Sequence, residues 1–190
     1  MFLMRCPRLF AATLLALIGW IETVSPVLAD SHTATPADLP ATSVPQGDRA
    51  IAGEGWTFAV PPDWQTTQTA PSNIGAIAIP AQLSDSQGQI FINLATEPLS
   101  GDFTNYIARS LESLSLFGFT VYDQRSVMVG LLEGVEVEST FPSTPPARVW
   151  QRILASDNTG YVLTCGTLET NAEAARTTCA TILNTFQISL

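Results

Sequence analysis

Three glutamates form the densest group of carboxylates in the chain: Glu133, Glu136 and Glu138. Side chains alternate along a β-strand, so in a strand Glu136 and Glu138 project to one face while Val135 and Val137 point to the other. Carboxylate oxygens are the ligands that hard cations prefer, and they need no histidine beside them. One hypothesis is therefore a Ca²⁺ or Mn²⁺ site at the three glutamates, although the spacing of an EF-hand loop is missing.

A pair of carboxylates can also serve a hydrolase. Glycosidases need only two acids about 5 to 9.5 Å apart. No cluster of sugar-binding aromatic residues stands beside these glutamates, which disfavours this reading. We therefore predict no catalytic residue and no resident cofactor other than the Ca²⁺ or Mn²⁺ of the first hypothesis.

Two arginines and a tryptophan follow the glutamates at the spacing of one strand face: Arg148, Trp150 and Arg152. If a hairpin pairs Glu136 with Arg152, Glu138 lies opposite Trp150, and acids and arginines interleave. The simplest interpretation is a solvated sheet face with cross-strand ion pairs worth about 0.2–1 kcal/mol each. The alternative is a partner-binding face, because exposed Trp and Arg are favoured at protein interfaces. That alternative requires Trp150 to be exposed.

The composition excludes several classes of chemistry. The chain has no lysine, and its one histidine, His32, lies in a stretch at 30–53 that is rich in Ala, Thr, Pro and Ser. The folded part, 54–190, therefore lacks the residues of Ser-His-Asp and Cys-His catalysis, histidine zinc sites, Schiff bases and the P-loop. The net charge of −9 also argues against nucleic acid and anionic membranes as partners.

The N-terminus has the pattern of a secretory signal peptide. Arg5 and Arg8 precede an apolar run at 9–21, and the small-residue site Val27-Leu28-Ala29 follows. We expect cleavage after Ala29 and an acidic exported product in the periplasm, the thylakoid lumen or the medium. The apolar run is shorter than the roughly 20 residues that span a bilayer. No lipobox cysteine follows it, so neither a transmembrane nor a lipid anchor is expected to remain.

Two cysteines lie beyond the signal, Cys165 and Cys179, and an even number in an exported protein favours a disulfide. Cys165 ends a run with strand composition. Cys179 lies on the apolar face of a helix expected at 170–184, which opens with the capping box Thr170 to Glu173. The predicted bridge closes a loop of about 15 residues, worth on the order of 3 kcal/mol.

The rest of the chain alternates between strand and helix patterns. A helix capped by Asp102 and ended by Gly118 is expected at 102–117. The leader at 30–53 is expected to be disordered. Strands are expected at 55–60, 74–79, 89–95, 119–122, 126–131, 134–141, 147–155 and 161–165. Short connections between them imply antiparallel pairing, and hence an α+β fold with helices packed on the sheet.

The segment at 55–64, Gly-Trp-Thr-Phe-Ala-Val-Pro-Pro-Asp-Trp, resembles the opening hairpin of the PsbP/Mog/DcrB-like superfamily. An acid-capped helix after the third strand and the closing strand and helix extend the resemblance over about 54–188. It implies an α/β/α sandwich around an antiparallel sheet. Members of the superfamily are mostly non-enzymatic and share no catalytic residue that could be transferred.

Export, the missing catalytic residue types and this resemblance lead to one functional prediction. We expect a non-enzymatic accessory protein that binds a protein partner in the envelope or the thylakoid lumen. The alternatives are the Ca²⁺ or Mn²⁺ site and, behind it, the carboxylate hydrolase.

Overall fold

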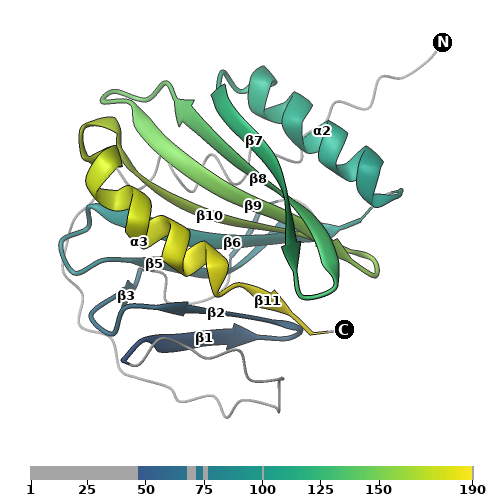
Figure 1. Ribbon diagram of the computed structural model, residues 1–190, viewed down its shortest axis with the longest axis horizontal. Coiled ribbons are helices and arrows are strands. Elements are labelled where there is room, and N and C mark those ends of the chain that lie inside the picture. The colour runs from purple at the N-terminus through teal and green to yellow at the C-terminus, as the bar shows by residue number, and fades with distance from the viewer. Residues whose placement is uncertain (1–46, 68–71, 75–76, 100, 190) are drawn as a thin grey trace.

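The computed structural model describes residues 47–67, 72–74, 77–99 and 101–189 (Figure 1). The strands are β1 (Arg49–Gly53), β2 (Trp56–Val60), β3 (Gln65–Thr66), β4 (Ser72–Ile74), β5 (Ile77–Ser84), β6 (Ile90–Pro98), β7 (Thr120–Val129), β8 (Leu132–Phe141), β9 (Ala147–Ser156), β10 (Thr159–Leu168) and β11 (Gln187–Ile188). The helices are α2 (Phe103–Leu116), the 3₁₀ turn η1 (Glu169–Asn171) and α3 (Ala172–Asn184).

The strands form two antiparallel sheets. The large sheet has eight strands in the order β3-β5-β6-β10-β9-β8-β7, with β4 paired to β5. The small sheet has the order β1-β2-β11. Two-residue turns join β7 to β8 and β9 to β10, which permits only antiparallel pairing, as the short connections predicted.

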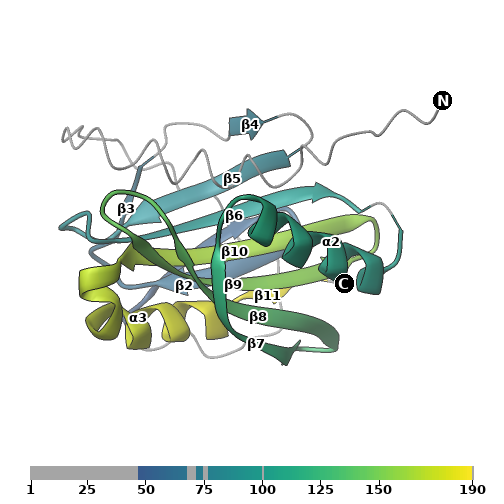
Figure 2. The same cartoon turned by 90° about the horizontal axis from the view of Figure 1, so that it is seen from above.

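The two helices cover opposite faces of the large sheet (Figures 1 and 2). On β9, Trp150 and Leu154 belong to an apolar cluster with residues of α3 and the small sheet. The alternate positions, Val149 and Ile153, belong to a second cluster with residues of α2. This alternation along one strand is the signature of a sheet buried on both faces. The α+β class and the predicted sandwich are confirmed.

The helix boundaries depend on different caps. The Asp102 carboxylate accepts a hydrogen bond from the Asn105 backbone N–H at 2.8 Å, and Gly118 follows α2 with φ +82°, as predicted. The capping box predicted at Thr170 is not formed, because η1 occupies those residues. The N-cap of α3 is Asn171, and its side chain makes no capping bond.

Several predictions differ from the structure, and the segment predicted as one strand at 74–79 is divided between β4 and β5, which pair with each other. The patterns at 119–122 and 126–131 belong to one strand, β7, which continues through the polar residues at 123–125. These polar residues are tolerated because nearly all of β7 is exposed. The leader predicted as disordered at 30–53 contributes its last residues to β1, which pairs with β2, and its residues before 47 lie outside the described part.

Gly134 allows two strands to approach closely. A Cβ atom there would lie 2.2 Å from Leu154 Cδ2 and 3.0 Å from the backbone oxygen of Ile153. The backbone oxygen cannot move without disturbing the sheet, so Gly134→Ala is expected to destabilise the protein by about 1–3 kcal/mol. Urea unfolding measures this, and an unchanged midpoint would show that the strands can separate without cost.

Candidate functional site

The central hairpin has the register that was considered from the sequence. Glu136 lies opposite Arg152, Glu138 opposite Trp150, and Thr140 opposite Arg148. Acids and arginines therefore interleave on one face of β8 and β9. The structure differs from the prediction in what covers this face.

Helix α3 buries the arginine and tryptophan face. Trp150 is 6% exposed and Arg152 is 5% exposed, while the Arg148 side chain retains 15%. Trp150 belongs to the cluster that α3 completes with Cys179 and Ile182. The partner-binding face predicted at Arg148, Trp150 and Arg152 required an exposed Trp150, and that part of the prediction is wrong. Sequence periodicity could not show which face α3 would cover.

Glu138 is the centre of a charged network at the edge of α3. Arg148 Nη1 donates to its Oε1 at 2.7 Å, and Arg176 on α3 donates to both oxygens at 2.7 and 2.9 Å. Arg148 also pairs with Glu169 in η1. Burial would raise the pKa of Glu138, but the hydrogen bonds from Arg176 and Arg148 outweigh it and hold the pKa below its usual value. The network joins α3 to the sheet.

Arg152 binds the C-terminal end of α3. Its guanidinium donates to the Leu183 carbonyl oxygen, to Asn184 Oδ1 at 2.9 Å and to Glu136 Oε2. The last carbonyls of a helix carry partial negative charge, which a guanidinium stabilises. Glu136 also binds the exposed Arg125 of β7. The buried guanidinium of Arg152 thus binds both the C-terminal end of α3 and the carboxylate of Glu136.

The three glutamates of the cation hypothesis do not form one ligand set. Glu133 lies at an odd position of β8, on the face opposite to Glu136 and Glu138. The oxygens of Glu136 and Glu138 already accept hydrogen bonds from arginines. Within the described ranges, no group of three His, Cys, Asp or Glu residues is arranged to hold a metal ion. The same arginine contacts oppose a hydrolase role for this pair.

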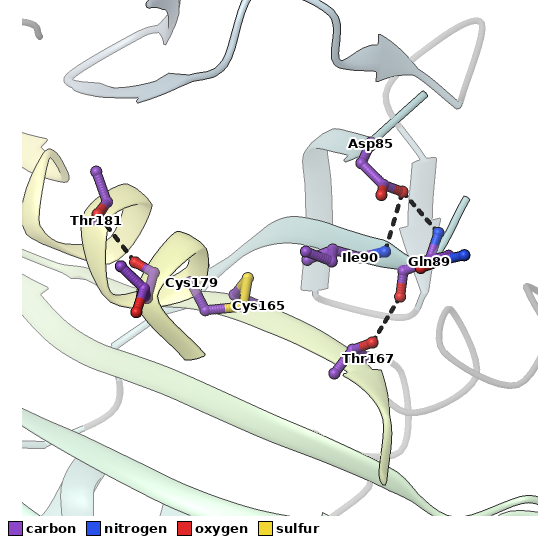
Figure 3. The surroundings of a disulfide bond; sticks show 8 residues. Asp85, Gln89, Ile90, Cys165, Thr167, Cys179 and Thr181 are labelled. Carbon is purple, nitrogen blue, oxygen red and sulfur yellow. Dashed lines mark hydrogen bonds between the residues drawn. A yellow bond between two sulfur atoms is a disulfide. The ribbon is translucent and has the colours of Figure 1, made fainter. Parts of the chain in front are cut away.

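The predicted disulfide between Cys165 and Cys179 is present, with a Cα–Cα distance of 5.6 Å (Figure 3). Both residues are fully buried in the cluster under α3. On the same strand as Cys165, Thr167 Oγ1 donates to the Gln89 carbonyl at 2.7 Å and so ties β10 to the β5–β6 turn. The bridge is structural, because neither sulfur reaches solvent.

The carboxyl group of Glu97, whose pKa is also shifted, lies beneath α2. Glu97 on β6 is 8% exposed, and it pairs in register with Gly160, over which the Tyr106 ring of α2 packs. Burial raises the pKa of the Glu97 carboxyl, and the Tyr106 hydroxyl and the charge of Arg109 only partly oppose this. Burial also raises the pKa of Tyr106 well above its ordinary value. Folding therefore favours the neutral form of Glu97.

Glu97 is expected to make stability depend on pH. The pKa of Glu97 is higher in the folded protein than in the unfolded chain, where it is about 4.3. The contribution of Glu97 to the stability of the fold is therefore fully present below about pH 4.3, and it is lost as pH rises through the pKa of the folded protein. Glu97→Gln should therefore unfold at a higher temperature than the wild type at pH 7, and the difference should shrink towards pH 4. Glu112→Gln, on the exposed side of α2, is the matched control. A difference that stayed constant with pH would contradict this assignment.

Sequence reasoning missed the most exposed large apolar residues in the described part of the chain. Over the described ranges, the large hydrophobic side chains that are exposed all lie at 116–131, on the end of α2, on β7 and in the turn that follows. They are Leu116 (65%), Val121 (38%), Tyr122 (58%), Met128 (66%) and Leu131 (85%). We call these five residues the β7 surface. Polar residues are interspersed among them, so no helical or strand periodicity in the sequence marks the five residues as a group.

The β7 surface is held in place from both sides. The Arg148 guanidinium stacks over the Tyr122 ring at 4.3 Å, so the charged network under α3 also positions an exposed aromatic residue. At the other end, the buried Val129 anchors β7 in the core before the turn. Rigid elements therefore present these apolar side chains.

Similarity to known proteins lies in the fold. No family model matches the chain, and no curated protein is significantly similar to it in sequence. The solution structure of cyanobacterial PsbP (CyanoP) from Synechocystis sp. PCC 6803 is similar with a TM-score of 0.57 and 8% identity, over 80% of this chain and 98% of that one. A Bacteroides thetaiotaomicron protein gives a TM-score of 0.50 at 9% identity, over 76% of this chain and 48% of its own.

The Ran-binding protein Mog1p from Saccharomyces cerevisiae gives a TM-score of 0.47 at 11% identity, over 74% of this chain and 95% of its own. At such identities a structural likeness speaks for fold and not for function. The likeness to cyanobacterial PsbP spans nearly all of that protein, and the chain accordingly has a fold similar to that of cyanobacterial PsbP.

Proposed function

We propose that this chain is an exported accessory protein that acts by binding another protein through the β7 surface. The observation that carries the proposal is the concentration of exposed apolar side chains at 116–131. Exposed apolar side chains concentrated on one segment are costly in water and typically mark interaction sites. Large aromatic and methionine side chains such as Tyr122 and Met128 are also enriched at interfaces.

The network at α3 supports a structural role in preference to catalysis. Glu136 and Glu138 have their oxygens bound by arginines, and the neutralising contacts hold the pKa of Glu138 low. A general acid needs a raised pKa, which is the opposite shift. Binding remains the function that the geometry supports best.

The disulfide supports the exported part of the proposal. The signal predicted at 1–29 lies outside the described residues, but the buried disulfide is typical of proteins from oxidising compartments. The cyanobacterial PsbP fold supports an accessory role as an analogy. No helix among the described residues is long and apolar enough to span a bilayer.

A size comparison of native extracts tests the proposal. We expect the wild-type chain to migrate in an assembly larger than its own mass, and Met128→Asp with Leu131→Asp to shift it to a smaller species. Both positions are strongly exposed, so the double variant should still fold. Glu173→Arg, on the outer side of α3, is the control. A variant that kept the wild-type size would contradict a binding role of the β7 surface.

A further inference from the structure

Strand β7 is an unpaired edge of the large sheet. Within the described residues, β8 is its sole strand partner, and nearly the whole ten-residue strand is exposed. Its sequence holds no proline, and no lysine occurs in the chain, so two common protections of sheet edges are missing. An edge of this kind offers backbone N–H and C=O groups to another strand.

The turn after β7 determines which backbone groups face outwards. Gly130 and Leu131 form a two-residue turn, so Val129 and Leu132 are the closing, hydrogen-bonded pair. Along β7, every second residue counted from Val129 is then hydrogen-bonded to β8 through its backbone. Arg125 and Asp123 are among these residues. The intervening residue Gln124 therefore directs its N–H and C=O away from the sheet.

The two charged residues that flank Gln124 would each meet an opposite charge in a second copy of β7. Asp123 and Arg125 carry opposite charges, flank Gln124 and lie on the α3 face, where Arg125 pairs with Glu136. When two antiparallel copies of β7 pair about Gln124, each Asp123 lies opposite the other copy's Arg125. Opposite charges at directly opposed positions stabilise an antiparallel pair, and like charges destabilise it. The outward hydrogen-bonding groups of Gln124 fit the same register.

We infer that the partner of the β7 edge is a second copy of this chain, joined about a two-fold axis at Gln124. This inference rests on the proposed function, because the strand that would pair also carries Val121, Tyr122 and Met128 of the β7 surface. A two-fold pairing makes the interface isologous, the commonest arrangement of soluble dimers. The bulge at Tyr122 lies just beyond Asp123, outside the three central pairs, and its ring is turned onto Arg148.

Charge exchange on the purified full chain tests the register. The wild type is expected to be a dimer by sedimentation equilibrium. Asp123→Arg creates two Arg–Arg contacts, and Arg125→Asp creates two Asp–Asp contacts, so each should weaken the dimer by about tenfold or more. An equal mixture of the two variants restores both opposite-charge pairs and is expected to form a heterodimer of wild-type affinity.

The controls separate this inference from the proposed function. Glu173→Arg changes the net charge as Asp123→Arg does, at an exposed site on α3 and not on β7, and should leave the dimer intact. A monomeric wild type at about 100 µM, or a dimer that neither variant weakens, would overturn the inference. A mixture that stayed monomeric would overturn the register. A monomer in the purified state together with a larger assembly in native extract would leave the proposed function standing with a different partner.

Discussion

Arg152→Met is expected to lower the free energy of unfolding by about 3–5 kcal/mol, because it leaves buried charge and polar groups uncompensated. The guanidinium is buried and binds Glu136, the Leu183 carbonyl and Asn184. Methionine fills a similar volume but donates no hydrogen bond, so the end of α3 loses its main polar contact with the sheet. Urea unfolding followed by tryptophan fluorescence measures the loss.

Two variants make the Arg152 test specific. Arg125→Met removes the exposed arginine that binds the same Glu136, and it should cost less than about 1 kcal/mol. Glu136→Gln combined with Arg152→Met removes the carboxylate that is left with only the exposed Arg125, and it should recover part of the loss. A loss for Arg152→Met as small as that for Arg125→Met would show that the buried network contributes nothing to the attachment of α3.

Removing the disulfide is expected to have the second large effect. Cys165 and Cys179 are 14 residues apart, and the loop they close is worth about 3 kcal/mol in the chain-entropy account. Their double replacement by alanine should lower the urea midpoint accordingly, with a further loss because both sites are fully buried.

Reduction provides the control for the disulfide. Dithiothreitol should lower the urea midpoint of the wild type towards that of the double alanine variant and should not change the variant itself. Because both sulfurs are buried, reduction is expected only under conditions that open α3. A wild type whose midpoint is the same with and without its bridge would contradict a stabilising role.

Local sequence patterns predicted most of the fold because each depends on nearby residues. Asp102 caps α2 through the Asn105 N–H, and the alternation placed Glu136 and Glu138 on one face, with Arg152 and Trp150 opposite them in the register that was considered. These features need only strand period, turn length and a capping residue. The disulfide followed from an even cysteine count and the same periodicities.

The features that were not predicted depend on tertiary packing. The solvated face expected at Trp150 is buried because α3 packs across the large sheet, where Leu183 of α3 meets Arg152 from 31 positions further along the chain. The β7 surface escaped notice because nearly all of β7 is exposed, so Tyr122 and Met128 follow no alternation of apolar and polar residues. A single sequence does not show which strand lies at the edge.

The central claim is that the β7 surface binds protein, and photocrosslinking in the native cell tests it most directly. A photoreactive residue replacing Met128 is expected to give an intermolecular adduct, whereas the same residue replacing Thr177 on the exposed side of α3 should give none. Replacing Tyr122 or Leu131 should give the same adduct as Met128. The absence of any intermolecular adduct from all three positions, or an equal yield from Thr177, would contradict the claim.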